Sequence, residues 1–172
     1  MIADSFPRLQ ARTARFTLGR PRGFVVSPDG ARVLFLRSRG GTDRVTCLWS
    51  YDVATGIESL LADPSELLAA GGDRADLPAT EKARRERARE QAGGIVGFST
   101  DAQVGVAAFT VVGRLFVTAL IGESSARNDD SGAAVRELTV GGPVFDPRLD
   151  PTGRAVAYAS NGTLRLAGVD NP

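Results

Sequence analysis

Short runs of alternating apolar and polar residues, separated by turn residues, recur along this chain and limit the folds that it can adopt. The first turn is Ser-Pro-Asp-Gly at residues 27–30, between apolar runs at 23–26 and 33–36, and it predicts a hairpin. Two further runs follow, at 47–53 and 57–61. Together these runs predict four successive antiparallel strands.

The same pattern then repeats along the chain. A second copy comprises residues 95–98, 104–111, 114–120 and 135–138, and a third comprises 144–145, 155–158 and 163–166. From turn to turn, Ser27 lies 72 residues before Ser99, and Ser99 lies 51 residues before Asp150. Without their insertions, both intervals approach the roughly 40 to 50 residues of a four-stranded propeller blade. The sequence therefore predicts an all-β fold, a partial β-propeller of about two and a half antiparallel blades.

The repeat also predicts how the chain is divided. We expect one domain, residues 1–172, with its parts at about 20–64 (blade 1), 65–93 (helical insertion), 94–141 (blade 2) and 142–172 (partial blade 3). Propellers usually have at least four blades, and an unclosed array exposes a strand edge and an apolar face. We therefore expect a piece of a longer protein, with a homodimer of the isolated chain as an open alternative.

One helix is predicted, from about residue 80 to residue 91. Thr80 can cap its first turn, Glu81 suits the positive end of the helix dipole, and Gly93 and Gly94 end it. The segment is rich in arginine and glutamate and has no apolar stripe beyond alanines. Two interpretations remain open, a solvated insertion without a role and a lid on the side where substrate binds.

The chain contains no histidine and a single cysteine, Cys47. Histidine is the usual general base near neutral pH and the commonest metal ligand. Its absence excludes Ser-His-Asp and Cys-His catalytic sites and His-bearing zinc sites within these 172 residues. We expect no catalytic residue, metal or cofactor here, and we expect Cys47 to be a small buried apolar residue.

Charge and hydropathy exclude further classes. The 21 basic and 20 acidic residues nearly cancel, so the chain lacks the basic footprint of a nucleic-acid-binding protein. The N-terminus lacks the pattern of a signal peptide, and no apolar run is long enough to span a membrane. We expect a cytoplasmic protein without a nucleic-acid or membrane partner. Lys82 is the only lysine, a bias towards arginine typical of a high-GC bacterial genome.

Several segments together resemble a known family. They are Arg-Phe-Thr-Leu-Gly at 15–19 before the turn at 27–30, Leu-Pro at 77–78, Arg-Glu-Arg-Ala-Arg at 85–89 running into Gly-Ile at 94–95, and Asp-Pro-Arg-Leu-Asp-Pro at 146–151. This combination resembles the start of the N-terminal propeller of dipeptidyl peptidase IV-like serine peptidases in the prolyl oligopeptidase family. The resemblance covers nearly the whole chain.

The resemblance implies that the parent protein is a hydrolase that removes N-terminal dipeptides from peptides. The catalytic triad would lie in a C-terminal α/β-hydrolase domain of the same polypeptide, which is absent from this chain. This segment would gate access of the peptide substrate and help to bind its N-terminal side. Arg89, by its position five residues before Gly94, matches the arginine that contacts substrate in the cytosolic relatives.

Other classes of function remain open. One is a scaffold propeller that binds proteins and has no hydrolase domain, and another is a complete small β protein. Residues 128–132 contain Asn and Asp but lack the spacing of a calcium loop, so a mobile loop is the better interpretation. The glycines of residues 93–97 follow a helix rather than precede one, which favours hinges over a phosphate-binding loop. The aromatic residues Trp49, Tyr51 and Phe109 are interpreted as packing between blades rather than as a recognition surface.

Overall fold

The computed structural model describes residues 5–70, 93–120 and 135–170. It is mostly β, with three antiparallel sheets whose strands follow one another in chain order. The first sheet contains β1 (Arg22–Val26), β2 (Arg32–Ser38), β3 (Thr46–Asp52) and β4 (Glu58–Ala62). The second contains β5 (Phe98–Thr100), β6 (Val106–Val111), β7 (Arg114–Ala119) and β8 (Val135–Leu138). The third contains β9 (Phe145–Leu149), β10 (Ala155–Ser160) and β11 (Thr163–Gly168).

The turn that opens each sheet is built in the same way. A polar residue begins the turn, its backbone N–H donates to the carbonyl five residues on, and its side-chain oxygen accepts a hydrogen bond from the N–H of that same later residue. The three pairs are Ser27 with Arg32, Asp101 with Val106 and Asp150 with Ala155. Local hydrogen bonding thus fixes where β2, β6 and β10 begin.

These hydrogen bonds also affect ionisation at the third turn. A hydrogen bond from the Thr152 side chain, followed by others from backbone N–H groups that include Ala155, lowers the pKa of Asp150 to about 2. The charged carboxylate is therefore the form that this turn stabilises.

The central strand pairs of the three sheets share one register. The fourth residue of β2, β6 or β10 pairs with a residue of the following strand, giving Phe35 with Trp49, Phe109 with Phe116 and Tyr158 with Arg165. The next position gives Leu36 with Leu48, Thr110 with Leu115 and Ala159 with Leu164. The three hairpins are thus copies of one unit, and a residue in one sheet has a defined equivalent in the next.

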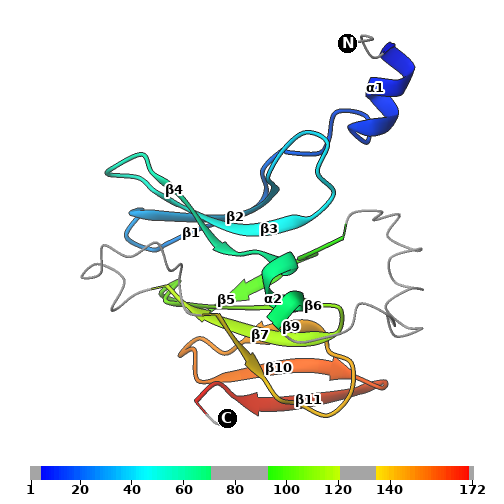
Figure 1. Cartoon of the computed structure of the whole chain (residues 1–172). Helices are drawn as coiled ribbons and strands as arrows, with labels where there is room; N and C mark the ends of the chain where they lie inside the picture. The colour runs from blue at the N-terminus through cyan, green and yellow to red at the C-terminus, as the bar shows by residue number, and fades with distance from the viewer. Residues whose placement is uncertain (1–4, 71–92, 121–134, 171–172) are drawn as a thin grey trace.

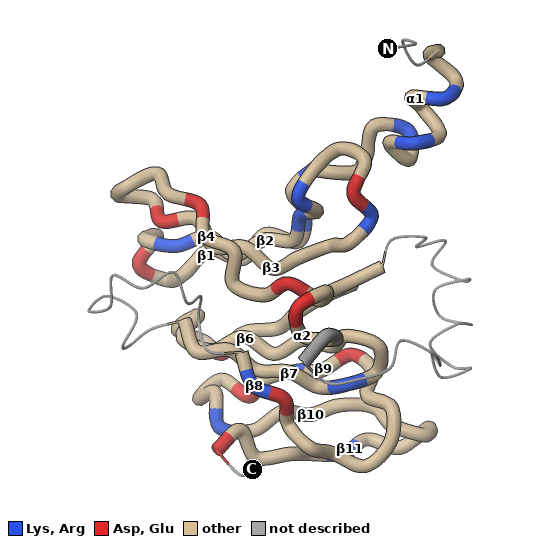
Figure 2. Tube along the Cα trace, in the orientation of Figure 1, with Lys and Arg blue, Asp and Glu red and all other residues tan. Residues whose placement is uncertain are grey.

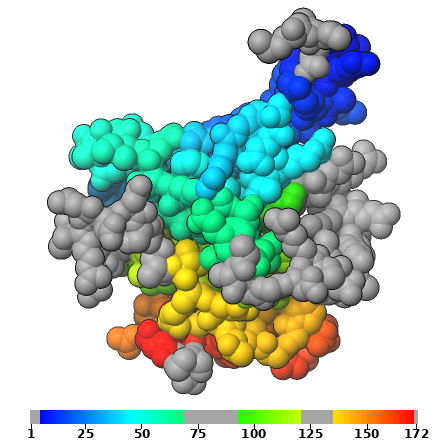
Figure 3. Space-filling view, viewed as in Figure 1, coloured from blue at the N-terminus to red at the C-terminus, as the bar shows by residue number. Residues whose placement is uncertain are grey.

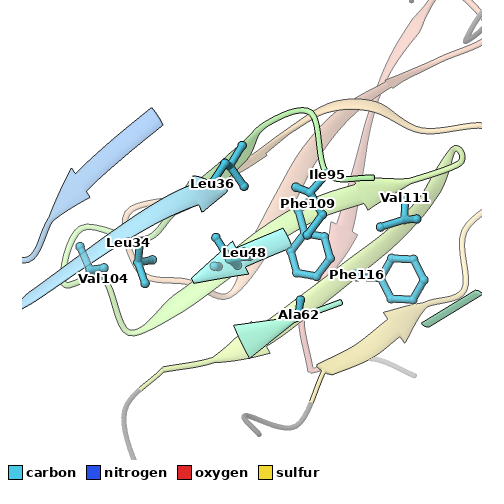
Figure 4. Close-up of a cluster of buried hydrophobic side chains, with 10 residues drawn as sticks. Leu34, Leu36, Leu48, Ala62, Ile95, Val104, Phe109, Val111 and Phe116 are labelled. Carbon is cyan, nitrogen blue, oxygen red and sulfur yellow. The ribbon is translucent and has the colours of Figure 1, made fainter. Parts of the chain in front are cut away.

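An apolar cluster joins the first two sheets (Figure 4). The first sheet contributes Leu34, Leu36 and Leu48, and the second contributes Phe109, which is fully buried. The rings of Phe109 and Phe116 stack with centroids 5.8 Å apart. Burying side chains of this size stabilises by about 1.5–3 kcal/mol each, so this layer is a main source of stability.

A second cluster joins the second and third sheets. Ala108, Leu115 and Val117 face Val156 and Tyr158, and all five are buried. Because successive residues of a strand point to opposite faces, β6 directs Phe109 to the first sheet and Ala108 to the third. The three sheets consequently stack in chain order, with the second sheet covered on both faces (Figures 1 and 3).

Two short helices flank the first sheet. Helix α1 (Phe6–Arg12) extends away from the sheets and has no buried residue, and helix α2 (Pro64–Ala70) follows β4 (Figure 1). The Asp63 carboxylate accepts a hydrogen bond from the N–H of Ser65 at the start of α2 and forms an ion pair of 2.6 Å with Arg39. Neither helix was predicted from the sequence, whereas the predicted helix at 80–91 lies outside the described residues.

Residues 93–95, where the described chain resumes, lie beside Thr46 at the start of β3. The Thr46 N–H donates to the Gly93 carbonyl, the Ile95 N–H donates to the Thr46 carbonyl, and both distances are 2.9 Å. Gly94, between them, has a φ of +103°, and a Cβ there would lie 2.5 Å from the Thr46 carbonyl oxygen. Only glycine fits this close approach.

The structure bears on several sequence predictions. The fold is mostly β, and the hairpin at 27–30 is confirmed. Cys47 is buried as predicted, and this burial is the main cause that raises the pKa of its thiol to about 12. Phe109 packs between sheets as predicted. Trp49 and Tyr51 lie with Phe35 and Val33 on the face of the first sheet that no described sheet covers, so the prediction is not tested for these two residues. Within the described ranges, no helix is long and apolar enough to cross a membrane.

Candidate functional site

A pocket of about 600 Å³ lies where three segments of the chain meet beside the first sheet. The first segment is the end of α1 with the turn that follows it. The second comprises the start of β1 and the end of β2, which lie side by side, and the third is the loop into β3. The lining residues are Gln10, Ala11, Ala14, Arg15, Thr17, Leu18, Gly19, Arg20, Arg22, Arg37, Ser38, Arg44 and Thr46. Five are arginines, none is acidic and none is aromatic.

Two of these arginines are held by contacts within the sheets. The Arg37 guanidinium makes a bidentate ion pair with Glu58, at 3.2 and 2.5 Å, and lies over the Trp49 ring, 4.6 Å from its centroid. Arg22 donates to the Val96 carbonyl oxygen at 3.2 Å. These contacts orient both side chains.

The other three arginines have no ion pair with any residue in the described ranges. Arg15, Arg20 and Arg44 are exposed. Figure 2, which colours Lys and Arg blue, shows blue segments along the loop below α1. Asp43, which precedes Arg44 in the sequence, accepts a hydrogen bond from the Val45 N–H and does not line the pocket. The pocket therefore carries unneutralised positive charge, although the chain as a whole has a formal charge of only +1.

The turn after α1 has an unusual backbone. Ala14, Arg15 and Phe16 have φ values of +47°, +61° and +63°, which L-residues rarely adopt in succession. Thr13 holds this turn, because its hydroxyl donates to the Leu9 carbonyl at 2.8 Å and accepts from the Phe16 N–H at 3.0 Å. A backbone held in this region by several hydrogen bonds is a reason to consider a functional role.

The turn is also attached to the opposite wall of the pocket. The Gly19 N–H donates to Ser38 Oγ at 2.9 Å, and Ser38 Oγ donates to the Gly40 carbonyl at 3.0 Å. Gly19 has a φ of +77°, and a Cβ there would lie 3.2 Å from the Gly40 carbonyl carbon. These contacts hold the arginines of the turn close to those of the sheet.

A second feature is the uncovered face of the third sheet. Leu164 and Leu166 are 78% and 74% exposed, whereas their equivalents in the second sheet, Leu115 and Val117, are 1% and 3% exposed. The outer face of the first sheet is also uncovered by any described sheet and exposes Phe24 and Val26, at 61% and 57%. The stack therefore presents apolar surface at both ends.

The segments that carry the family resemblance lie in different places. Of residues 15–19, all but Phe16 line the arginine pocket. Asp146 and Arg148 form an ion pair of 2.8 Å and line a small pocket with residues of the second sheet. Arg89, the one residue predicted to touch substrate, lies outside the described residues, as does the loop at 128–132. The prediction for Arg89 is therefore untested by the structure.

Guanidinium groups supply the charged donors of the described pocket. The Cys47 thiol, with its pKa raised to about 12 by burial, is protonated near neutral pH and is not a nucleophile. Among the residues that the structure describes, no three Cys, Asp or Glu side chains gather as metal ligands. The arginines can hold an anion through charge-assisted hydrogen bonds.

Sequence reasoning did not find the pocket. Arg15, Arg20 and Arg22 stand within eight residues of one another, a local excess of positive charge that was visible in the sequence. Arg37 and Arg44 join them only through the pairing of β2 with β1 and β3.

No family model matches this chain. Among solved structures, it is similar to a chain in a complex of KlAtg21 with the coiled-coil of AgAtg16, with 8% sequence identity and a TM-score of 0.46. The alignment covers 84% of this chain and 38% of that chain, so this chain spans less than half the length of its structural neighbour.

Proposed function

We propose that this chain is a noncatalytic segment of a β-propeller whose parent protein is a serine-type dipeptidyl peptidase. The three sheets would be consecutive blades, and the segment would gate access of peptides to a hydrolase domain elsewhere in the polypeptide. The observation that carries the propeller part is the exposure of Leu164 and Leu166, at positions that are buried in the preceding sheet.

The repeat supports further sheets at both ends of the stack. In the second and third sheets, Phe109 and Tyr158 pack against the sheet before them. Their equivalent in the first sheet, Phe35, lies beneath the exposed Phe24 ring, 6.1 Å away, on a face without a described sheet. A closed ring of such sheets would cover this face and the face of Leu164 together, which is how propellers protect their apolar surfaces.

The peptidase part rests on the resemblance of residues 15–19, 85–95 and 146–151 to that family. The chain has no histidine, so a Ser-His-Asp triad must come from another part of the polypeptide. In this proposal Arg89 contacts the peptide substrate, as a guanidinium can hydrogen-bond a substrate carbonyl or a carboxylate.

The peptidase proposal is tested on the full-length polypeptide that contains this chain. We expect it to cleave a chromogenic dipeptide substrate with a free N-terminus, and we expect Arg89→Ala to lower kcat/KM about tenfold or more, the loss of one charged hydrogen bond. Arg154→Ala, a change at an exposed arginine in the turn before β10, is the control. A full-length protein without a Gly-x-Ser-x-Gly elbow and without activity would leave a scaffold propeller as the function.

The propeller proposal has a separate test in the 172-residue chain. We expect the isolated chain to associate with increasing concentration through its uncovered apolar faces, as measured by analytical ultracentrifugation. Replacing Leu164 and Leu166 with threonine, which favours strands but is polar, should weaken the association. Ile57→Thr, at a residue 60% exposed in the turn between β3 and β4, is the control. A strictly monomeric chain that binds no hydrophobic dye would contradict the proposal.

A further inference from the structure

We propose that the arginine-lined pocket between α1 and the first sheet binds an oligophosphate, an anion with several closely spaced phosphate groups. This proposal is independent of the peptidase proposal, since it rests only on residues of the described pocket. No catalytic step is assigned to the site.

The charges of the pocket lining favour an anion. Five arginines share the lining of this pocket, and no acidic residue lines it. Of these five, only Arg37 is paired with a carboxylate within the described ranges. Like charges held close together repel one another, and an anion that sits among them removes this repulsion while it gains charge-assisted hydrogen bonds.

Hydroxyl groups in the pocket wall are already engaged in hydrogen bonds. Ser38 Oγ already accepts from the Gly19 N–H and donates to Gly40, and the Thr17 hydroxyl donates to the Ala14 carbonyl at 2.6 Å. The groups left to recognise a ligand are therefore mainly guanidinium groups. Planar guanidinium groups with several N–H donors match the oxygen atoms of phosphate in bidentate geometry.

The size and composition of the pocket indicate what kind of anion fits it. A volume of about 600 Å³ exceeds what a single phosphate ion needs and falls within the range of small-molecule sites. Aromatic side chains, on which a nucleobase would stack, are absent from the described lining, and the few apolar residues are Leu18 and alanines. The lining thus favours a compact, highly charged ligand over a nucleotide base or an apolar molecule.

Hydrogen bonds within the chain hold the backbone of the pocket wall in place. The left-handed turn at 14–16 is held by Thr13 and is attached to β2 through Gly19 and Ser38. A preformed arrangement reduces the ordering that binding requires.

The test is isothermal titration calorimetry of the full 172-residue chain with inorganic tripolyphosphate. We expect saturable binding that weakens as salt concentration rises. Arg15→Ala and Arg44→Ala should each weaken binding about tenfold, because each removes a charge-assisted hydrogen bond. Arg154→Ala, in the turn before β10 and outside the pocket lining, should bind like the unchanged protein.

Two further measurements distinguish loss of the site from loss of the fold, and phosphate from other anions. Circular dichroism melts show whether each variant is folded, and Arg20→Gln provides a milder change at the same pocket. Equal binding of citrate and tripolyphosphate would overturn the assignment to phosphate. Absence of binding, or binding unchanged in folded Arg15→Ala and Arg44→Ala variants, would overturn the site itself.

Discussion

Leu115 and Leu164 occupy the same position in two copies of the repeated hairpin, and substituting each by alanine compares the effect of burial alone. Each pairs with the fifth residue of the strand before it, Thr110 or Ala159. Leu115 is 1% exposed beneath the third sheet, whereas Leu164 is 78% exposed. The two substitutions remove the same atoms from the same strand position.

The expected effects differ several-fold. Leu115→Ala should lower the free energy of unfolding by about 2–5 kcal/mol, because it leaves a cavity between the second and third sheets. Leu164→Ala should change it by less than about 0.5 kcal/mol, as is usual for surface substitutions. Urea unfolding followed by circular dichroism and by the fluorescence of Trp49 measures both.

The outcome also bears on the propeller proposal. In a longer polypeptide whose next sheet covers β11, the cost of Leu164→Ala should rise into the range of Leu115→Ala. A large cost for Leu164→Ala in dilute 172-residue chain, or a negligible cost for Leu115→Ala, would refute the assignment of these faces as uncovered and covered.

Three further outcomes follow from the structure. Because the folded-state pKa of Asp150 is about 2, below the ordinary 3.8, its ionised form stabilises the fold above pH 3.8, and this contribution is lost as pH falls from 3.8 towards 2. Thermal melts of Asp150→Asn should lack this part of the acid dependence, and identical acid profiles would contradict it. Cys47 should resist a thiol reagent such as Ellman's reagent at neutral pH until the chain is unfolded, since its thiol is buried and has a pKa of about 12; rapid reaction in the folded chain would show that it is accessible. Gly94→Ala should destabilise by about 1–3 kcal/mol, because the new Cβ would clash with the Thr46 carbonyl at a φ of +103°, while Gly93→Ala, with open space around it, serves as the control in the same melts.

The strands of this protein could be predicted because their information is local. Alternating apolar residues define a strand, and Ser27, Asp101 and Asp150 stand where side-chain hydrogen bonds begin the next strand. The end of the second sheet, predicted at 135–138, agrees with β8.

The two short helices also had local signals, which the sequence analysis did not use. Ser5 precedes α1 with Pro7 near its start, and Asp63 precedes Pro64 at the start of α2. A capping residue followed by proline in the first turn is typical of a helix start. Both helices are seven residues long, too short to show an apolar period.

The candidate site depended on contacts between distant segments. Arg15, Arg37 and Arg44 belong to a turn, a strand and a loop, and the pairing of β1, β2 and β3 brings those segments together. A nearly neutral composition conceals such a cluster, because net charge carries no information about where charges lie in space.

The sequence by itself determined the repeated hairpins, the mostly β fold and the absence of histidine-based catalysis, because these depend on residue type and on spacing along the chain. Only the tertiary structure decided which face of each hairpin is covered. Leu115 and Leu164 have the same identity and the same place in the repeat, and they differ only because a sheet packs over one of them. The same holds for the arginines, whose common pocket exists only once the strands are paired.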